Sequence, residues 1–188
     1  MAHGRLIVIA GPSGVGKGSL VRRLVARDPD GPVLSVSATT REPRAGEIDR
    51  VDYRFASEDE FDQMIERGDL LEWAAIVGHR SGTPRAFVTE QLDAGRDVIL
   101  EIDVEGARQI RERMPEALLI FLVPPSFEEL ERRLRGRGTE DEELIRRRLD
   151  TSAWEMDQRD WFDHEVINDD LVRATDEVAA IIEASHTL

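Results

Sequence analysis

A glycine-rich segment near the N-terminus has residue types that suit phosphate binding. It reads Gly11-Pro12-Ser13-Gly14-Val15-Gly16-Lys17-Gly18-Ser19. Glycines allow successive backbone N–H groups to converge on one anion, and a lysine can reach bridging and terminal phosphate oxygens. Lys17 is the only lysine among the 25 basic residues of the chain, so its place in this segment is itself informative. The segment predicts a phosphate-binding loop.

The loop departs from the usual pattern G-x-x-x-x-G-K-[ST] at its last position. Residue 18 is glycine, and the hydroxyl comes one place later, at Ser19. In the usual pattern that hydroxyl binds Mg²⁺, which Gly18 cannot do. We therefore expect Mg²⁺ as a cofactor that is held mainly by nucleotide oxygens and water, without a direct protein ligand.

The elements around the loop predict how it is positioned. A short apolar run, Arg5–Ala10, precedes it and is typical of a strand buried on both faces. Lys17–Arg27 has apolar residues at helical spacing and predicts a helix. Further buried strands are predicted at Val33–Ser37, Asp97–Asp103 and Ala117–Val123. Strands that alternate with helices indicate an α/β fold with a parallel sheet.

The composition of the sequence changes between Ala38 and Gly95, where turn-forming residues and arginines predict an inserted lobe. A helix is predicted over Ser57–Arg67, and Ser57 with Glu60 has the pattern of a capping box at its start. Leu70–Val77 is a candidate strand that returns toward the body of the protein. The lobe therefore has a helix and a strand of its own.

Two helices joined by a glycine-containing break are predicted later in the chain. The first spans Ser126–Arg135 and begins with a capping box formed with Glu129. The break is Gly136–Gly138, and the second helix starts near Glu140. Seven arginines lie between Arg132 and Arg148. On charge alone, this segment reads equally well as a solvated charged hairpin.

Length and composition limit the class of protein. A chain of 188 residues fits one domain, and its last predicted element is an amphipathic helix over Leu171–Ile182. The net charge of −14 would repel a polyanion, so we expect no nucleic-acid partner. No apolar stretch approaches the roughly 18–20 residues of a membrane-spanning helix. The absence of cysteine fits a reducing cytoplasm, and we expect a cytoplasmic protein without a membrane partner.

Further motifs resemble the guanylate kinase family, in the family's order and over nearly the whole chain. Ser35–Glu47, followed by Val51–Phe55, looks like the nucleotide-monophosphate lobe of that family. Several motifs at compatible spacing are far more specific than any one of them. The others are Leu70–Ala74, Ile99–Gly106, Pro124–Ser126, Leu134–Thr139 and Val166–Asp170.

The resemblance implies a P-loop kinase fold in a single domain, with a parallel sheet core flanked by helices. The core would comprise residues 1–37 and 96–188, the GMP-binding lobe about 38–95, and a lid about 136–142. It also implies transfer of a phosphoryl group from ATP to GMP, and to dGMP, in a monomer or homodimer. Phosphoryl transfer needs positioning and charge stabilisation more than covalent chemistry.

Four residues of the lobe would bind the acceptor phosphate, namely Ser37, Arg41, Arg44 and Tyr53. Their chemistry supports this role independently. Two guanidinium groups offer paired donors to a dianion, and the two hydroxyl groups add further hydrogen bonds. Without the resemblance, the same arginines could be ordinary residues of a surface turn.

Three residues fall where the family recognises guanine: Glu72, Thr83 and Asp103. Guanine presents N1–H and N2–H₂ donors, which a carboxylate can accept, whereas adenine presents a bare ring nitrogen there. Glu101 lies two residues before Asp103 on the same predicted strand, so both point to one side and both are assigned to the GMP site. Alternatively, Glu72 pairs with a nearby arginine, and the acids at the strand end cap a helix.

One stretch departs from the family, which commonly has two tyrosines before Gly-[ST]. Here the residues are Gly78-His79-Arg80-Ser81-Gly82-Thr83. Because a serine cannot span the distance that the second tyrosine covers, Arg80 replaces it, water fills the gap, or acceptor affinity is lower. His79 is expected to be a surface loop residue.

The arginine-rich segment would supply lid residues that close over the transferred phosphoryl group. The resemblance selects Arg137 and Arg148 and leaves Arg133 and Arg135 open. Cations that arrive on closure stabilise charge on the equatorial oxygens. The catalytic set is then Lys17, Arg41, Arg137 and Arg148. The ATP-binding set is Gly11, Pro12, Ser13, Gly14, Val15, Gly16, Lys17, Gly18, Ser19 and Asn168, although a turn-forming asparagine would look the same.

Two other functions stay open. A guanylate-kinase-like module that binds protein ligands would share the fold, but such modules generally lack a working ATP loop. A kinase of the same fold could instead act on another phosphorylated acceptor, such as ribose 1,5-bisphosphate. Glu72 and Asp103 argue against the sugar, because it has no pair of donors for them.

Overall fold

The strand before the phosphate loop, β1 (Leu6–Ala10), lies at the centre of a five-stranded parallel sheet. Leu6 pairs with Val98 on one side, and Ile7 pairs with Leu118 on the other. The computed structural model describes residues 3–76, 78–136 and 142–186. The order across the sheet is β2 (Val33–Leu34), β7 (Val98–Glu101), β1, β8 (Leu118–Val123) and β9 (His164–Ile167).

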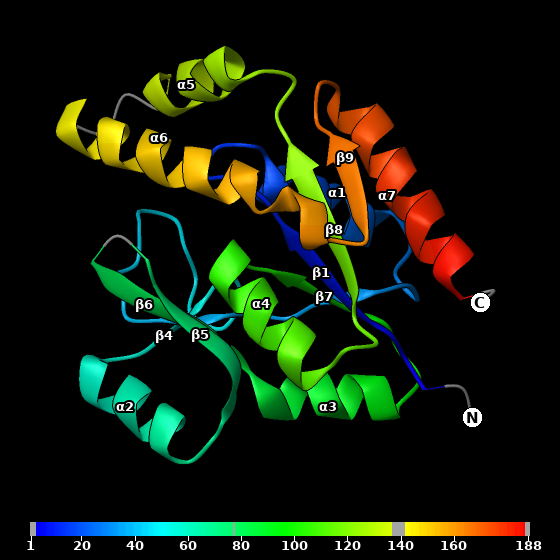
Figure 1. Ribbon diagram of the computed structural model, residues 1–188. Helices are drawn as coiled ribbons and strands as arrows, with labels where there is room; N and C mark the ends of the chain where they lie inside the picture. The colour runs from blue at the N-terminus through cyan, green and yellow to red at the C-terminus, as the bar shows by residue number, and fades with distance from the viewer. Residues whose placement is uncertain (1–2, 77, 137–141, 187–188) are drawn as a thin grey trace.

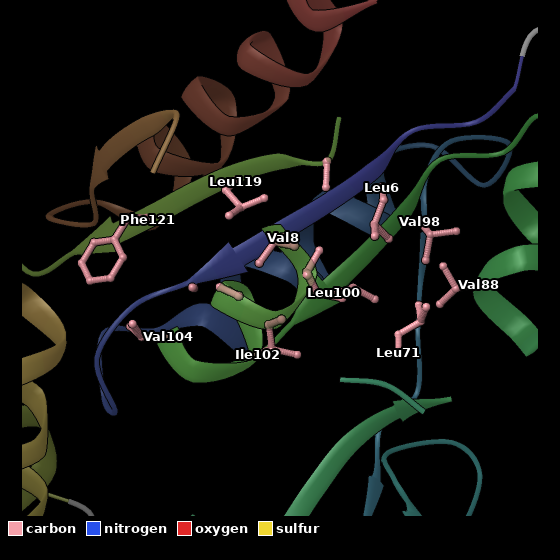
Figure 2. Close-up of a cluster of buried hydrophobic side chains, with 14 of the residues drawn as sticks. Leu6, Val8, Leu71, Val88, Val98, Leu100, Ile102, Val104, Leu119 and Phe121 are labelled. Atoms are coloured by element: carbon pink, nitrogen blue, oxygen red, sulfur yellow. The ribbon is translucent and has the colours of Figure 1, made fainter. Parts of the chain in front are cut away.

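Both faces of this sheet are buried, as the continuous apolar strands predict. Leu6 and Val8 of β1 belong to one core cluster, whereas Ile7 and Ile9 belong to the other. Figure 2 shows the first cluster, in which Val88 lies close to Val98. Since successive side chains of a strand point to opposite faces, a strand between two helical layers must be apolar throughout.

Helices cover the two faces. The first cluster includes residues of α3 (Arg85–Asp93) and α4 (Val104–Arg113). The second includes residues of α1 (Lys17–Arg27), α5 (Phe127–Arg135) and α7 (Leu171–Ser185). This arrangement confirms the predicted α/β fold with a parallel sheet flanked by helices.

A second, four-stranded sheet belongs to the segment 38–84 and lies at the lower left in Figure 1, together with α2 (Glu58–Glu66). Its order is β4 (Arg54–Phe55), β3 (Ala38–Thr39), β6 (His79–Pro84) and β5 (Leu70–Ile76). Phe61, Met64, Leu70 and Ala38 form its small core. The helix pair α5 and α6 (Glu142–Asp157) lies at the upper left.

Some predicted boundaries differ from the structure. The strand predicted over Val33–Ser37 keeps only Val33–Leu34, because the chain crosses to the second sheet and pairs there from Ala38. The Ser57 capping box is confirmed. The second predicted box is half formed, since Ser126 accepts from the Glu129 N–H while the Glu129 carboxylate binds arginines. In the part of the chain that is described, no helix has the length and apolarity needed to cross a membrane.

Candidate active site

The predicted phosphate loop connects β1 to α1. Gly11, Gly14 and Gly16 have φ of 145°, 88° and 103°, which other residues rarely adopt. A Cβ on Gly11 would lie 2.3 Å from the carbonyl oxygen of Leu122, so this position also needs glycine for space. The backbone of the loop therefore depends on the glycines that the motif supplies.

Lys17, at the first position of α1, reaches back across the loop. Its Nζ donates to the carbonyl oxygens of Gly11 at 2.5 Å and Pro12 at 3.2 Å. The ammonium group thus lies over the loop that would hold the phosphates. This geometry suits a lysine that interacts with terminal phosphate oxygens.

Gly18 faces a carboxylate. A Cβ on Gly18 would lie 3.3 and 3.4 Å from the two carboxyl oxygens of Glu101 at the end of β7. Burial raises the pKa of Glu101, and Lys17 and Arg22 partly oppose this effect. The place where other phosphate loops carry a hydroxyl is therefore next to an acid from the adjacent strand.

Asn168 and Arg133 support the loop from the other side. The buried Asn168 side chain donates from Nδ2 to the Val15 carbonyl oxygen at 2.7 Å. Arg133 donates to the carbonyl oxygens of Val15 and Asn168, both at 3.2 Å, and from Nε to Glu129 at 2.8 Å. Arg133 thus braces the phosphate loop, a contact that the charge pattern does not indicate.

Arg41 lies in a loop of the second lobe and is held by Glu47. Its Nη2 donates to the two carboxylate oxygens of Glu47 at 2.8 and 2.9 Å, and the guanidinium lies 5.2 Å from the ring centroid of Tyr53. Glu47 also accepts from the backbone N–H of Arg44 at 2.7 Å. Although burial acts to raise the pKa of Glu47, these arginines bring it below its usual value. Arg44 is exposed, and Ser37 is half-buried immediately before β3.

Glu72 on β5 and Thr83 on β6 pair directly across the second sheet. Both are buried, and the Thr83 hydroxyl donates to Glu72 Oε1 at 2.6 Å. Burial raises the pKa of Glu72 to about 7, even though the bond from Thr83 lowers it. Buried acids with such shifts are concentrated at functional sites.

Asp103 approaches the same place from the main sheet. A Cβ on Gly106 would lie 2.6 Å from Glu72 Oε2 and 3.3 Å from Asp103 Oδ1, so both acids lie over this glycine. Asp103 caps α4 by accepting from the Gly106 N–H at 2.7 Å, and burial raises its pKa. Asp103 therefore caps a helix, as the alternative interpretation expects, and it also lies close to Glu72.

The structure describes only part of the predicted lid. Arg137 and most of the proposed lid, residues 136–142, lie outside the described residues. Arg148 on α6 donates to the Ser13 hydroxyl oxygen at 3.4 Å, which brings it to the phosphate loop. Arg135 instead pairs with Glu131 and Glu142.

Arg80 is bound by acids of α2. Its guanidinium donates to Glu58 at 2.8 Å and to Asp62 at 2.6 Å, both on α2. Ser81 donates to the Ala38 carbonyl oxygen at 3.3 Å. Arg80 therefore joins β6 to α2.

The phosphate loop on the parallel sheet, and a second lobe whose buried Glu72 converges with Asp103 over Gly106, together define a kinase of the P-loop class. The comparisons with known proteins identify the family. The guanylate kinase model matches residues 3–185, so the chain belongs to the guanylate kinase family.

Individual relatives are similar over nearly full length. A guanylate kinase of Rhodococcus jostii (strain RHA1) is 52% identical over 182 residues, covering 96% of this chain and 87% of its own. A guanylate kinase of Synechococcus sp. (strain CC9902) is 55% identical over 175 residues, covering 93% of each chain. The crystal structure of guanylate kinase from Anaplasma phagocytophilum superposes with a TM-score of 0.81 at 30% identity, covering 97% of this chain and 86% of that one.

Proposed function

We propose that this chain transfers the terminal phosphoryl group of ATP to GMP and to dGMP. A phosphate oxygen of the acceptor attacks the γ-phosphorus, the bond to the β–γ bridging oxygen breaks, and the products are ADP and the nucleoside diphosphate. The observation that carries this proposal is the convergence of Glu72, Thr83 and Asp103 in a buried site of a P-loop kinase. Residues 38–95 are the acceptor lobe in this proposal, and the rest is the core with its lid.

Guanine recognition is assigned to the paired acids. Glu72 accepts from guanine N1–H and N2–H₂, while Thr83 orients the carboxylate through its 2.6 Å hydrogen bond. Adenine would leave the buried acid without donors, and unpaired buried groups of this kind give discrimination of about 10⁴-fold. Asp103 assists from the end of the main sheet. This chemistry favours a purine that carries two adjacent donors.

The phosphate groups are assigned to cations of both lobes. Lys17 and the loop 11–19 bind ATP, while Arg41, Arg44, Ser37 and Tyr53 bind the phosphate of GMP. Arg148 neutralises charge on the transferred group from α6. Asn168 holds the loop, and its contact with adenine stays a prediction. Positioning and charge stabilisation are the main contributions of a protein to such a transfer.

The site fits Mg²⁺, which would neutralise charge on the ATP phosphates when bound. Gly18 leaves space beside the loop, and the Glu101 carboxylate lies against that space. Carboxylates and water are usual Mg²⁺ ligands. Glu101, assigned above with the GMP site, is thus also the residue that would hold the ion, directly or through water.

A panel of acceptors tests the proposal. ADP release from Mg·ATP is measured with GMP, dGMP, AMP, UMP, CMP and ribose 1,5-bisphosphate at equal concentrations. We expect turnover with the two guanine nucleotides alone. Activity with the sugar only would discard the guanine site, and inactivity with every acceptor would favour a protein-binding module.

A further inference from the structure

The amide side chain of Gln109 makes two hydrogen bonds with one residue of the acceptor lobe. Gln109 is half-buried on α4, and α4 packs beside β5 (Figure 1). Its Oε1 accepts from the backbone N–H of Trp73 at 3.3 Å, and its Nε2 donates to the Trp73 carbonyl oxygen at 2.7 Å. The side chain therefore binds the backbone of β5 in the way that a residue of a neighbouring strand would.

The place of Trp73 in its sheet explains why such a partner is needed. β5 is the last strand in the order of the four-stranded sheet, so its outer edge faces α4 rather than another strand. Backbone groups at the edge of a sheet need a partner where they are shielded from water. Gln109 supplies that partner from the core of the protein, and it thereby joins the acceptor lobe to the core at Trp73.

A second side chain of α4 holds β5 on the other side of Glu72. Arg113 donates from Nη1 to the carbonyl oxygen of Leu71. Gln109 and Arg113 are four residues apart on a helix, which is about 6 Å along its axis. Leu71 and Trp73 are two residues apart on a strand, which is about 6.8 Å. Because the two spacings match, one face of α4 holds both chain neighbours of Glu72.

The same helix begins at the predicted guanine site. Asp103 is the N-cap of α4, and Gly106 lies in the first turn of that helix. A Cβ on Gly106 would lie 2.6 Å from Glu72 Oε2, so the helix backbone approaches this carboxyl closely. The position of β5 along α4 therefore sets how the carboxyls of Glu72 and Asp103 lie relative to each other.

We propose that Gln109 is a positioning residue for guanine recognition, whose amide holds β5 against α4 so that Glu72 and Asp103 meet the base together. This inference rests on the proposed phosphorylation of GMP. The hydrogen bond from Thr83 to Glu72 lies within the acceptor lobe, whereas the bonds of Gln109 join that lobe to the core. A recognition group that is held in place before binding loses less entropy when the base arrives.

Two substitutions at Gln109 separate positioning from packing. Gln109→Met keeps the length of the side chain and removes both hydrogen bonds with Trp73. Gln109→Glu keeps an acceptor for the Trp73 N–H and places a second acceptor against the Trp73 carbonyl oxygen. The matched control is Gln91→Met, which makes the same change at a half-buried glutamine of α3 whose side chain accepts from Arg96 at 3.5 Å.

The decisive readout is the choice between GMP and IMP, because IMP lacks the 2-amino group of guanine. We expect Gln109→Met to raise the KM for GMP about tenfold and to keep the KM for ATP within about twofold. The ratio of kcat/KM for GMP to kcat/KM for IMP should fall about fivefold, since a displaced Glu72 no longer meets the 2-amino donors.

The other variants and a binding measurement complete this comparison. Gln109→Glu should show at least the same changes, because its carboxylate repels the Trp73 carbonyl oxygen. Gln91→Met should keep the values of the original protein. Calorimetric binding of GMP and of IMP without ATP should show the same order of variants. In the nucleotide-free protein, the Trp73 amide should exchange hydrogen faster in Gln109→Met than in the original protein.

Other results overturn the inference. A ratio for GMP over IMP that stays unchanged in both Gln109 variants would do so even if kcat falls, because a purely structural role lowers the use of both acceptors equally. Equal increases in the KM for ATP and for GMP would do so as well. If Gln109→Met does not fold, Gln109→Glu decides the question. Failure of the original protein to phosphorylate GMP would refute the proposed function, and the calorimetric preference for GMP over IMP would still decide the role of Gln109.

Discussion

The carboxyl of Glu72 and the hydroxyl of Thr83 are joined by a 2.6 Å hydrogen bond between paired residues of adjacent strands. Glu72 is 3% exposed and Thr83 is 1% exposed, so solvent water does not satisfy their polar atoms. The bond fixes one carboxyl oxygen, and the other lies over Gly106 at the start of α4. A buried acid oriented in this way can distinguish bases by the donors on their edges.

Replacing Glu72 by glutamine should therefore change acceptor choice. One of the two guanine donors would then face the NH₂ group of the amide. We therefore expect kcat/KM for GMP to fall by about 10²–10⁴-fold. Thr83→Val keeps the shape and removes only the orienting bond, and should cost about tenfold. Kinetics with GMP and AMP measure both effects. A Glu72→Gln variant with unchanged kcat/KM for GMP would refute the assignment.

Stability should fall as pH rises across a defined window. Burial raises the folded-state pKa of Glu72 and of Glu155 to about 7 from an ordinary value of 4.5, so the folded protein binds more protons than the unfolded chain between these values. The free energy of unfolding then decreases from about pH 4.5 to 7, by roughly 1–3 kcal/mol for each acid. Urea denaturation of the ligand-free protein at several pH values measures this slope.

Glu72→Gln should make that slope shallower, because the amide does not titrate. The matched control is Glu90→Gln, which replaces an exposed acid on α3. We expect the control to keep the slope of the original protein. Equal slopes in the Glu72 variant and the original protein would show that burial of Glu72 does not govern this pH range.

The sequence predicts local elements better than contacts between distant residues. The helix Lys17–Arg27 matches its prediction because its apolar spacing and preceding glycines are local signals. The second strand ends early because Ser35 still bonds to Ile99 but the chain then leaves for the other sheet. Nothing near residue 35 signals that crossing. The end of this strand is therefore set by the topology of the chain, and a short stretch of sequence around the strand carries no information about that topology.

The difference between local and distant contacts also explains which site residues the sequence predicts. The phosphate loop is contiguous and has a physical motif, whereas the guanine site depended on resemblance to a family. Arg133 contacts Val15 from more than 100 residues away, and its own surroundings in sequence are ordinary charged helix. The contact of Glu47 with Arg41 is easier to predict from the sequence, because an acid six residues after an arginine can fold back on it in a turn.

Lys17→Ala should remove most turnover while the fold remains. Lys17 is the only lysine of the loop, and its ammonium group donates to the carbonyl oxygens of Gly11 and Pro12, where alanine places no cation. We expect kcat to fall about 10²–10³-fold, as when one charge-stabilising donor is lost. Arg23→Ala, on the exposed face of α1, is the control and should be neutral. Near-normal kcat in Lys17→Ala would overturn the site.

Arg41→Ala should impair use of GMP more than binding of ATP. The guanidinium is oriented by Glu47 and the ring of Tyr53, and a lysine cannot reproduce its paired donors. We expect kcat/KM for GMP to fall about 10²-fold or more in both Arg41→Ala and Arg41→Lys. Arg67→Ala at the exposed end of α2 serves as the control. Equal losses of ATP and GMP affinity would argue for a general structural effect.

Gly18→Ser and Glu101→Gln together test how the metal is held. A Cβ at residue 18 would contact the Glu101 oxygens at 3.3 and 3.4 Å, so a serine hydroxyl there would donate to the carboxylate. We expect Gly18→Ser to shift the Mg²⁺ concentration for half-maximal turnover by less than about threefold, and Glu101→Gln to raise it about tenfold. Glu105→Gln, an exposed acid at the start of α4, is the control. If Glu101→Gln instead raises the KM for GMP and leaves the Mg²⁺ titration unchanged, Glu101 belongs to the acceptor site alone.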